Sequence, residues 1–190
     1  MKKNIFIFHG TEGYPEENWF PWMKKKLEQK GYSVFVPQFP TPPAIPAKIV
    51  EWFDVLEKYK QYINEDTVFI GHSLGGIFLL RVLEKLRHPV KAAFFVGTPI
   101  GIEPIVNYDR DKSFSGFSFE WTIIRKKARH FEVFQSDDDP CVGLENGSEL
   151  AKNLDVMLTF VPNAGHFNKN AGYTKFEKLR DRILKVLEDE

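Results

Sequence analysis

Short apolar runs alternate with amphipathic segments along the whole of this 190-residue chain. The apolar runs are typical of buried strands and cover residues 5–8, 33–36, 67–70, 92–96, 131–134 and 156–161. Apolar residues spaced three or four apart predict helices over residues 19–29, 49–63, 74–86, 144–154 and 174–187. Strands that alternate with helices form βα units. We therefore expect one α/β domain over residues 1–190, a three-layer α/β/α sandwich with a six-stranded, mostly parallel sheet.

Residues 98–128 interrupt this alternation. The segment is rich in Gly, Pro and aromatic residues, and only its end, residues 119–128, has the spacing of a short helix. We expect a lid-like excursion from the sheet, which at about thirty residues is small for a cap. The pocket beneath it should be shallow and fairly open.

Polar residues follow several strands at the point where each strand ends. In a parallel sheet the carboxyl ends of the strands meet at one edge, where ligands bind. Ser73 follows the third predicted strand, Asp137 to Asp139 follow the fifth, and His166 follows the sixth. The chain order Ser, Asp, His is that of the α/β-hydrolase catalytic triad.

The serine lies in Gly71-His72-Ser73-Leu74-Gly75, a complete Gly-x-Ser-x-Gly nucleophile elbow. The tight strand-to-helix turn strains the backbone at the serine and leaves no room for side chains two residues away. The pattern predicts Ser73 as the nucleophile and His166 as its general base. His72 should point away from its neighbour Ser73. For His9, the simpler interpretation is that it shapes the first loop rather than acting as the base. The alternative is an ordinary glycine turn that happens to contain a serine.

The acid of the triad is one of three consecutive aspartates. The usual spacing is a strand, two loop residues and then the acid, which selects Asp138 and leaves Asp139 as the second candidate. A cluster of carboxylates also suits a hard cation, but this one lacks the spaced ligands and the glycine of a calcium loop. We expect neither a metal nor a cofactor.

An oxyanion hole needs two backbone N–H donors. The first should belong to Leu74, which follows the nucleophile at a helix N-terminus. The second should come from the loop after the first strand, and Thr11 is the best placed residue there. The competing hypothesis of a phosphate-binding loop fails, because residues 9–13 match neither the dinucleotide nor the P-loop pattern.

Composition narrows the possible partners. Lys plus Arg and Asp plus Glu each number 26, so the balanced charge gives no general attraction to nucleic acid or to a membrane surface. The single cysteine, Cys141, excludes a disulfide framework and fits a reducing compartment. The apolar run at residues 5–8 is too short for a signal peptide, and no run approaches the roughly 18 apolar residues of a membrane span. We expect a cytoplasmic protein of unassigned oligomeric state.

Several motifs together resemble a known family. His9-Gly10-Thr11-Glu12-Gly13, Trp19-Phe20-Pro21-Trp22, the elbow, Asp138-Asp139 and Gly165-His166-Phe167 are similar to those of the small serine hydrolases grouped with retinoblastoma-binding protein nine. The resemblance spans nearly the whole chain and implies a trimmed α/β-hydrolase fold with Ser73, Asp138 and His166 as the triad. The Leu-x-Cys-x-Glu segment that binds the retinoblastoma protein does not occur around Cys141, so that partner is not expected.

The expected activity is hydrolysis of small esters or amides through an acyl-enzyme, of the carboxylesterase type. Aromatic residues of the first loop and of residues 98–128 are candidates for the pocket walls, or else ordinary core: Tyr14, Trp19, Phe114, Phe117, Phe119 and Trp121. A non-catalytic interaction module with the same fold is the alternative, although a decayed enzyme would usually have lost a triad position. The fold by itself does not identify the substrate.

Overall fold

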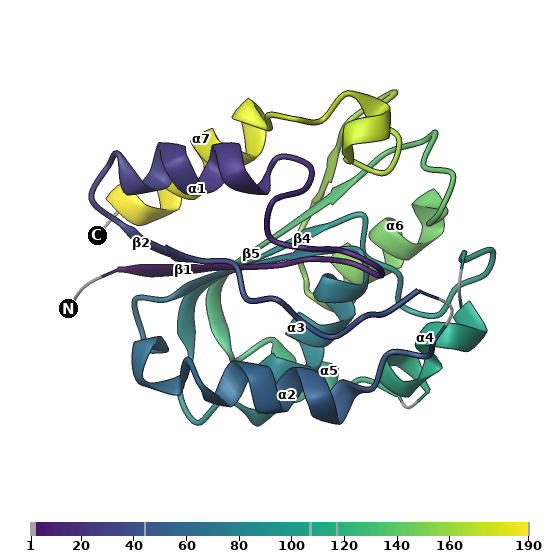
Figure 1. The fold of residues 1–190 in the computed structure, drawn as a ribbon, viewed down its shortest axis with the longest axis horizontal. Coiled ribbons are helices and arrows are strands. Elements are labelled where there is room, and N and C mark those ends of the chain that lie inside the picture. Colours follow the sequence, from purple (N-terminus) through teal and green to yellow (C-terminus); the bar gives the residue numbers. More distant parts are fainter. Residues whose placement is uncertain (1–2, 44, 107, 117, 190) are drawn as a thin grey trace.

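The computed structural model describes residues 3–43, 45–106, 108–116 and 118–189. Within these residues six strands form one sheet in the order β2-β1-β3-β4-β5-β6 (Figure 1). The strands are β1 (Asn4–Phe8), β2 (Ser33–Phe35), β3 (Val68–His72), β4 (Val90–Val96), β5 (Ala128–Gln135) and β6 (Leu158–Phe160). Each neighbouring pair is parallel. The predicted fold class is therefore confirmed, with a sheet that is parallel throughout.

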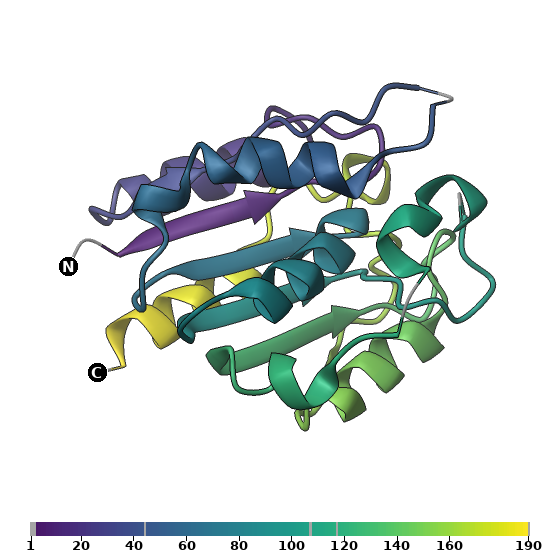
Figure 2. The ribbon, with the colours of Figure 1, turned by 90° about the horizontal axis from the view of Figure 1, so that it is seen from below.

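Helices cover both faces of the sheet. The helices are α1 (Phe20–Glu28), α2 (Ile49–Glu57), α3 (Leu74–Lys85), α4 (Tyr108–Ser115), α5 (Trp121–Ile124), α6 (Leu144–Asn153) and α7 (Glu177–Glu188). In Figures 1 and 2, α1 and α7 lie side by side on one face, while α2 and α3 lie on the other. No helix in the described part of the chain is long and apolar enough to cross a membrane.

The core has two layers because strand side chains point alternately to the two faces. In β1, Ile5 and Ile7 pack in the layer beneath α1 and α7, whereas Phe6 and Phe8 pack in the layer beneath α2 and α3. All five residues of β1 are buried. A strand covered on both faces reads as a continuous apolar run, which explains why the strands stand out in the sequence.

The segment over residues 98–128 is more regular than predicted. The expected short helix is present as α5, but α4 was not predicted, because Tyr108–Ser115 has little apolar periodicity. Two hydrogen bonds fasten α4 to the body of the protein. Arg81 Nε donates to the carbonyl of Phe114 (3.0 Å), and Ser113 Oγ donates to the carbonyl of Ala47 (2.8 Å).

Candidate active site

Ser73 lies in the turn between β3 and α3 with a strained backbone. Its φ of +54° and ψ of −124° are rare for a residue with a side chain and cost about 1–3 kcal/mol. The surrounding hydrogen bonds hold this geometry: the Ser73 N–H donates to the carbonyl of Val96 (2.9 Å), and the Gly76 N–H donates to the carbonyl of Ser73 (2.8 Å). The turn has the backbone geometry expected of a nucleophile elbow.

Glycines on either side of Ser73 permit a close approach of backbone segments. A Cβ on Gly75 would lie 2.3 Å from the carbonyl oxygen of Phe8, and one on Gly71 would lie 2.6 Å from the Cα of Gly76. These contacts are far shorter than van der Waals distance and involve backbone that has little freedom to move. The two glycines of the motif therefore let α3 begin directly against β1 and β3.

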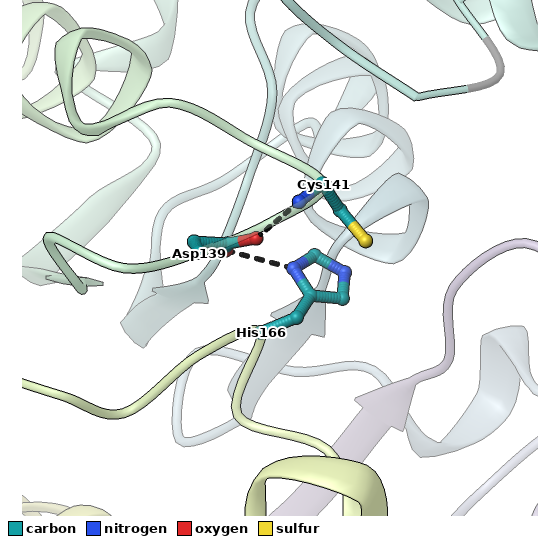
Figure 3. Close-up of side chains that lie close together, drawn as sticks. All are labelled: Asp139, Cys141 and His166. Atoms are coloured by element: carbon teal, nitrogen blue, oxygen red, sulfur yellow. Dashed lines mark hydrogen bonds and ion pairs between the residues drawn. The ribbon is translucent and has the colours of Figure 1, made fainter.

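His166 is paired with Asp139 (Figure 3). Its Nδ1 lies 2.8 Å from Asp139 Oδ2, and the Asp139 side chain is fully buried. The other carboxylate oxygen, Oδ1, accepts the N–H groups of Cys141 (2.8 Å) and Val142 (3.0 Å). An ionised acceptor favours the tautomer with the proton on Nδ1, which leaves Nε2 of His166 available as a base.

The choice of Asp138 as the partner of His166 was wrong by one residue. β5 ends at Gln135, one residue beyond the predicted run 131–134, and three residues rather than two then precede the aspartate that reaches the histidine. Asp138 is exposed, and its Oδ1 accepts instead from the Ser136 hydroxyl (2.6 Å) and the Gly165 N–H (2.7 Å). The hydrogen bond from Ser136, and after it the one from Gly165, lowers the pKa of Asp138. Ser136 is buried as well, and its hydroxyl oxygen accepts the N–H of Ala164 (2.9 Å) in the loop after β6.

All three aspartates help to place His166, each in a different way. Asp137 Oδ1 accepts the N–H of Asn163 (2.9 Å), Asp138 holds the N–H of Gly165, and Asp139 holds the imidazole itself. The loop after β5 thus fixes the backbone of the loop after β6 as well as the histidine ring. This division of roles differs from the cation-binding alternative, in which the carboxylates would converge on one point.

Two further histidines are buried and act structurally. His9 Nε2 accepts the N–H of Phe39 (2.9 Å), and burial lowers the pKa of His9 to about 4. His72 Nε2 lies 2.8 Å from the carbonyl oxygen of His166, and burial and then the charge of His166 lower the pKa of His72 to about 3. Both rings are therefore neutral near pH 7.

The predicted oxyanion donors lie at the mouth of the same pocket. Leu74 is the first residue of α3, so its N–H has no carbonyl partner within the helix. Thr11 lines the pocket from the loop after β1, and its hydroxyl donates to Asp111 of α4 (2.5 Å). Both residues border the pocket that contains Ser73 and His166.

This pocket has a volume of about 530 Å³, and the predicted aromatic residues contribute little to it. Tyr14 lines it and is half exposed. Trp19 does not line it, because its ring is fully buried and its indole N–H donates to the carbonyl of Phe167 (3.0 Å). Trp121 packs with Phe119 against the core rather than lining the pocket. Phe117 lies outside the described residues.

Phe114 is fully buried as well, with its ring 5.0 Å from that of Trp52. The lid-like segment lines the pocket instead with the aliphatic side chains of Ile105 and Val106 and with the polar Asp111 and Ser115. Ile105 and Val106 lie there beside Val142. A β-bridge joins Ile105 to Val142, and the Val106 N–H donates to the carbonyl of Cys141 (3.0 Å). The pocket wall is therefore attached to the two residues whose amides hold Asp139.

The pocket also has polar lining residues that were not predicted. Glu16, Glu17 and Asn18, which precede α1, line it together with Lys169 from the segment after His166. Burial raises the pKa of Glu17 to about 7, partly offset by a backbone hydrogen bond from Tyr14. No pattern in the sequence indicates that Glu17 lines the pocket, since a glutamate in a loop is usually solvated.

A comparison with protein-family models now identifies the chain. The serine hydrolase family model matches residues 5–185. The chain belongs to the serine hydrolase family. This confirms the resemblance seen in the sequence and the hydrolytic function that it implied.

Two relatives of this serine hydrolase cover all or most of its length. YdeN from Bacillus subtilis, whose name describes it as a hydrolase, is 28% identical over 190 residues, which is 100% of this chain and 99% of YdeN. The crystal structure of the ydeN gene product superposes with a TM-score of 0.92 at 29% identity and covers 99% of this chain and all of the other. Serine hydrolase RBBP9 from Rattus norvegicus is 30% identical over 173 residues, or 89% of this chain and 86% of RBBP9.

More distant structures share the fold. Est1E from Butyrivibrio proteoclasticus with bound ferulic acid has a TM-score of 0.74 at 14% identity, covering 97% of this chain and 89% of Est1E. At this identity the likeness concerns the arrangement of the sheet and helices alone.

One further grouping surrounds the histidine of this serine hydrolase. Ligand-type atoms of Asp139, Cys141 and His166 lie within 4.8 Å of one another, and Figure 3 shows the Cys141 sulfur beside the imidazole. The Asp139 carboxylate, however, already accepts hydrogen bonds from Gln135, His166 and two backbone amides. Its arrangement is that of a hydrogen-bonded acid, and burial and the nearby Asp139 raise the pKa of the Cys141 thiol.

Proposed function

We propose that this serine hydrolase is a carboxylesterase that cleaves small esters through a triad of Ser73, His166 and Asp139. The observation that supports it best is the buried Asp139–His166 pair, which opens onto the same pocket as the strained Ser73. The pair leaves the base nitrogen of His166 free, and the strained turn presents the serine at the carboxyl edge of the sheet.

In the first half of the proposed reaction, Ser73 Oγ attacks the ester carbonyl while His166 Nε2 takes its proton. The negative charge that develops on the carbonyl oxygen is held by the N–H groups of Leu74 and Thr11. Asp139 stabilises the imidazolium without accepting its proton. His166 then gives the proton to the leaving alcohol, and the acyl group remains on Ser73.

In the second half, water attacks the acyl-enzyme with His166 again as the base. The carboxylic acid is released and the serine recovers its proton. Two glycines leave room around these groups: a Cβ on Gly10 would lie 3.3 Å from Ser73 Oγ, and one on Gly97 would lie 3.3 Å from His166 Nδ1. The aliphatic wall of Ile105, Val106 and Val142 favours a short apolar acyl chain.

The test is hydrolysis of p-nitrophenyl butyrate by the purified protein and by Ser73→Ala. We expect the variant to lose at least about 10³-fold in kcat/KM, because the covalent step is removed. A fluorophosphonate probe should label the wild-type protein at Ser73 and leave the variant unlabelled. Undiminished hydrolysis by the variant would contradict the proposal, and so would a wild-type protein that neither cleaves the ester nor reacts with the probe.

A further inference from the structure

The residues that line the pocket carry an excess of negative charge. Among the described residues that line the pocket, three are acidic and one is a lysine, namely Glu16, Glu17, Asp111 and Lys169. Asp111 accepts the Thr11 hydroxyl, and Glu16 and Lys169 are exposed. Glu17 is the carboxylate whose role the proposed chemistry does not explain.

Glu17 is half-buried without a basic partner. No Lys or Arg side chain in the described ranges forms an ion pair with it, and its Oε1 lies against Gly13, where a Cβ would be 2.6 Å away. Removing a carboxylate from water without a cation is unfavourable. A cationic group that enters the pocket beside Glu17 would relieve this cost, so the site favours such a group over a neutral one of the same shape.

The loop that carries Glu17 is attached to the segment that follows His166, and both residues line one pocket. The next residue, Asn18, accepts the N–H of Lys169 through its Oδ1 (2.8 Å), which ties this loop to the segment that follows His166. His166 gives its proton to the leaving group, so the leaving group lies on the histidine side of the pocket. The aliphatic side chains of Ile105 and Val142 line the same pocket and suit the apolar acyl chain.

We propose that Glu17 is a specificity-determining residue that binds a cationic group on the leaving alcohol of the ester. The substrate class is then an ester of a short apolar acid with an amino or ammonium alcohol. This inference rests on the proposed function, and it adds the charge of the leaving group, which neither the fold nor the triad determines.

Two esters that differ in charge but hardly in shape test this inference. They are the butyrates of 2-(trimethylammonio)ethanol and of 3,3-dimethylbutanol, assayed at pH 8 so that a carboxyl with a pKa of about 7 is ionised. We expect the wild-type protein to prefer the cationic ester by about fivefold in kcat/KM, the size expected for a partly exposed ion pair. Glu17→Gln should reduce this ratio to about one, since it keeps the shape and removes the charge.

Glu16→Gln is the matched comparison, because it removes one carboxylate from the adjacent, exposed position. We expect it to change the ratio by less than about twofold, since an exposed charge is screened by solvent. A ratio near one in the wild-type protein would overturn the proposal. A preference for the cationic ester that persists in Glu17→Gln would also overturn it. The same holds for a preference that Glu16→Gln abolishes equally, because Glu17 would then not be its cause.

A binding measurement separates this inference from the proposed function. Calorimetric titration gives the dissociation constants of the two esters, and their ratio measures the preference for the cationic ester without turnover. The proteins to compare are Ser73→Ala and Ser73→Ala combined with Glu17→Gln. If the wild-type protein cleaves neither these two esters nor p-nitrophenyl butyrate and does not react with the fluorophosphonate probe, the proposed esterase function fails. Glu17 is then still judged by binding: a cationic preference lost in Glu17→Gln supports its role, and equal affinities refute it.

Discussion

Replacing Asp139 by asparagine changes charge and hydrogen bonding with almost no change in shape. The asparagine Oδ1 still accepts the N–H groups of Cys141 and Val142, so the loop keeps its anchor. The amide nitrogen then faces His166 Nδ1 at the position where an acceptor stood 2.8 Å away. A donor at this position favours the histidine tautomer with its proton on Nε2, which is the nitrogen that has to act as a base.

The size of the effect follows from these contacts. A hydrogen bond between charged groups in a buried site contributes about 3 kcal/mol. The reversed tautomer adds a further cost, because only the minor form of His166 then accepts the serine proton. Together these terms predict a fall of about 10³- to 10⁴-fold in kcat/KM, or about 4–5.5 kcal/mol of transition-state stabilisation.

The assay compares Asp139→Asn with Asp138→Asn on p-nitrophenyl butyrate. Asparagine at position 138 keeps the oxygen that accepts from Ser136 and Gly165, so this variant should lose less than about tenfold. Urea denaturation checks that both variants remain folded. If Asp138→Asn lowers kcat/KM more than Asp139→Asn does, our assignment of the acid is refuted.

Three predictions concern stability, each measured by urea denaturation. Gly75→Ala should cost about 3 kcal/mol, because the new Cβ would meet the Phe8 carbonyl oxygen at 2.3 Å; unchanged stability would contradict this close approach. Trp19→Phe should cost about 1–3 kcal/mol, since it leaves the buried carbonyl of Phe167 without its indole donor; a loss below about 0.5 kcal/mol would speak against that role. Lowering the pH from 7 to 5 should reduce stability by about 2 kcal/mol through His9 and by about 2 kcal/mol more through His72, because their pKa values of about 4 and about 3 lie below the unfolded value, so that the unfolded chain binds both protons first. Glu17, whose pKa is raised to about 7, acts in the opposite direction, so this last measurement uses the Glu17→Gln protein; a flat pH dependence there would refute it.

The features that the sequence predicted are those encoded locally. The strands stand out because both faces of the sheet are covered, so that β1, for example, is an uninterrupted apolar run. The elbow around Ser73 is visible because the glycines that permit its geometry are immediate neighbours in the chain. These signals sufficed for the fold class, and they placed Ser73 and His166 in one pocket.

The errors concern features that depend on contacts distant in the sequence. The aspartate that pairs with His166 was misplaced by one residue, because the number of residues that a loop uses depends on how Ser136 pairs with Ala164 in the neighbouring loop. Trp19 was assigned to the pocket as an aromatic residue of the first loop. Its ring instead packs against His72 and Phe176, and no local pattern indicates those neighbours.

The bridge between the pocket wall and the loop of the acid bears on how this enzyme can be re-engineered. Ile105 and Val106 are the natural positions at which to enlarge the pocket, yet both are bonded to Cys141 and Val142, whose amides hold Asp139. In the proposed mechanism, a change in this pocket wall is therefore expected to reach the residue that orients His166. Libraries at these two positions should include residues 141 and 142 and should be screened for rate as well as for affinity.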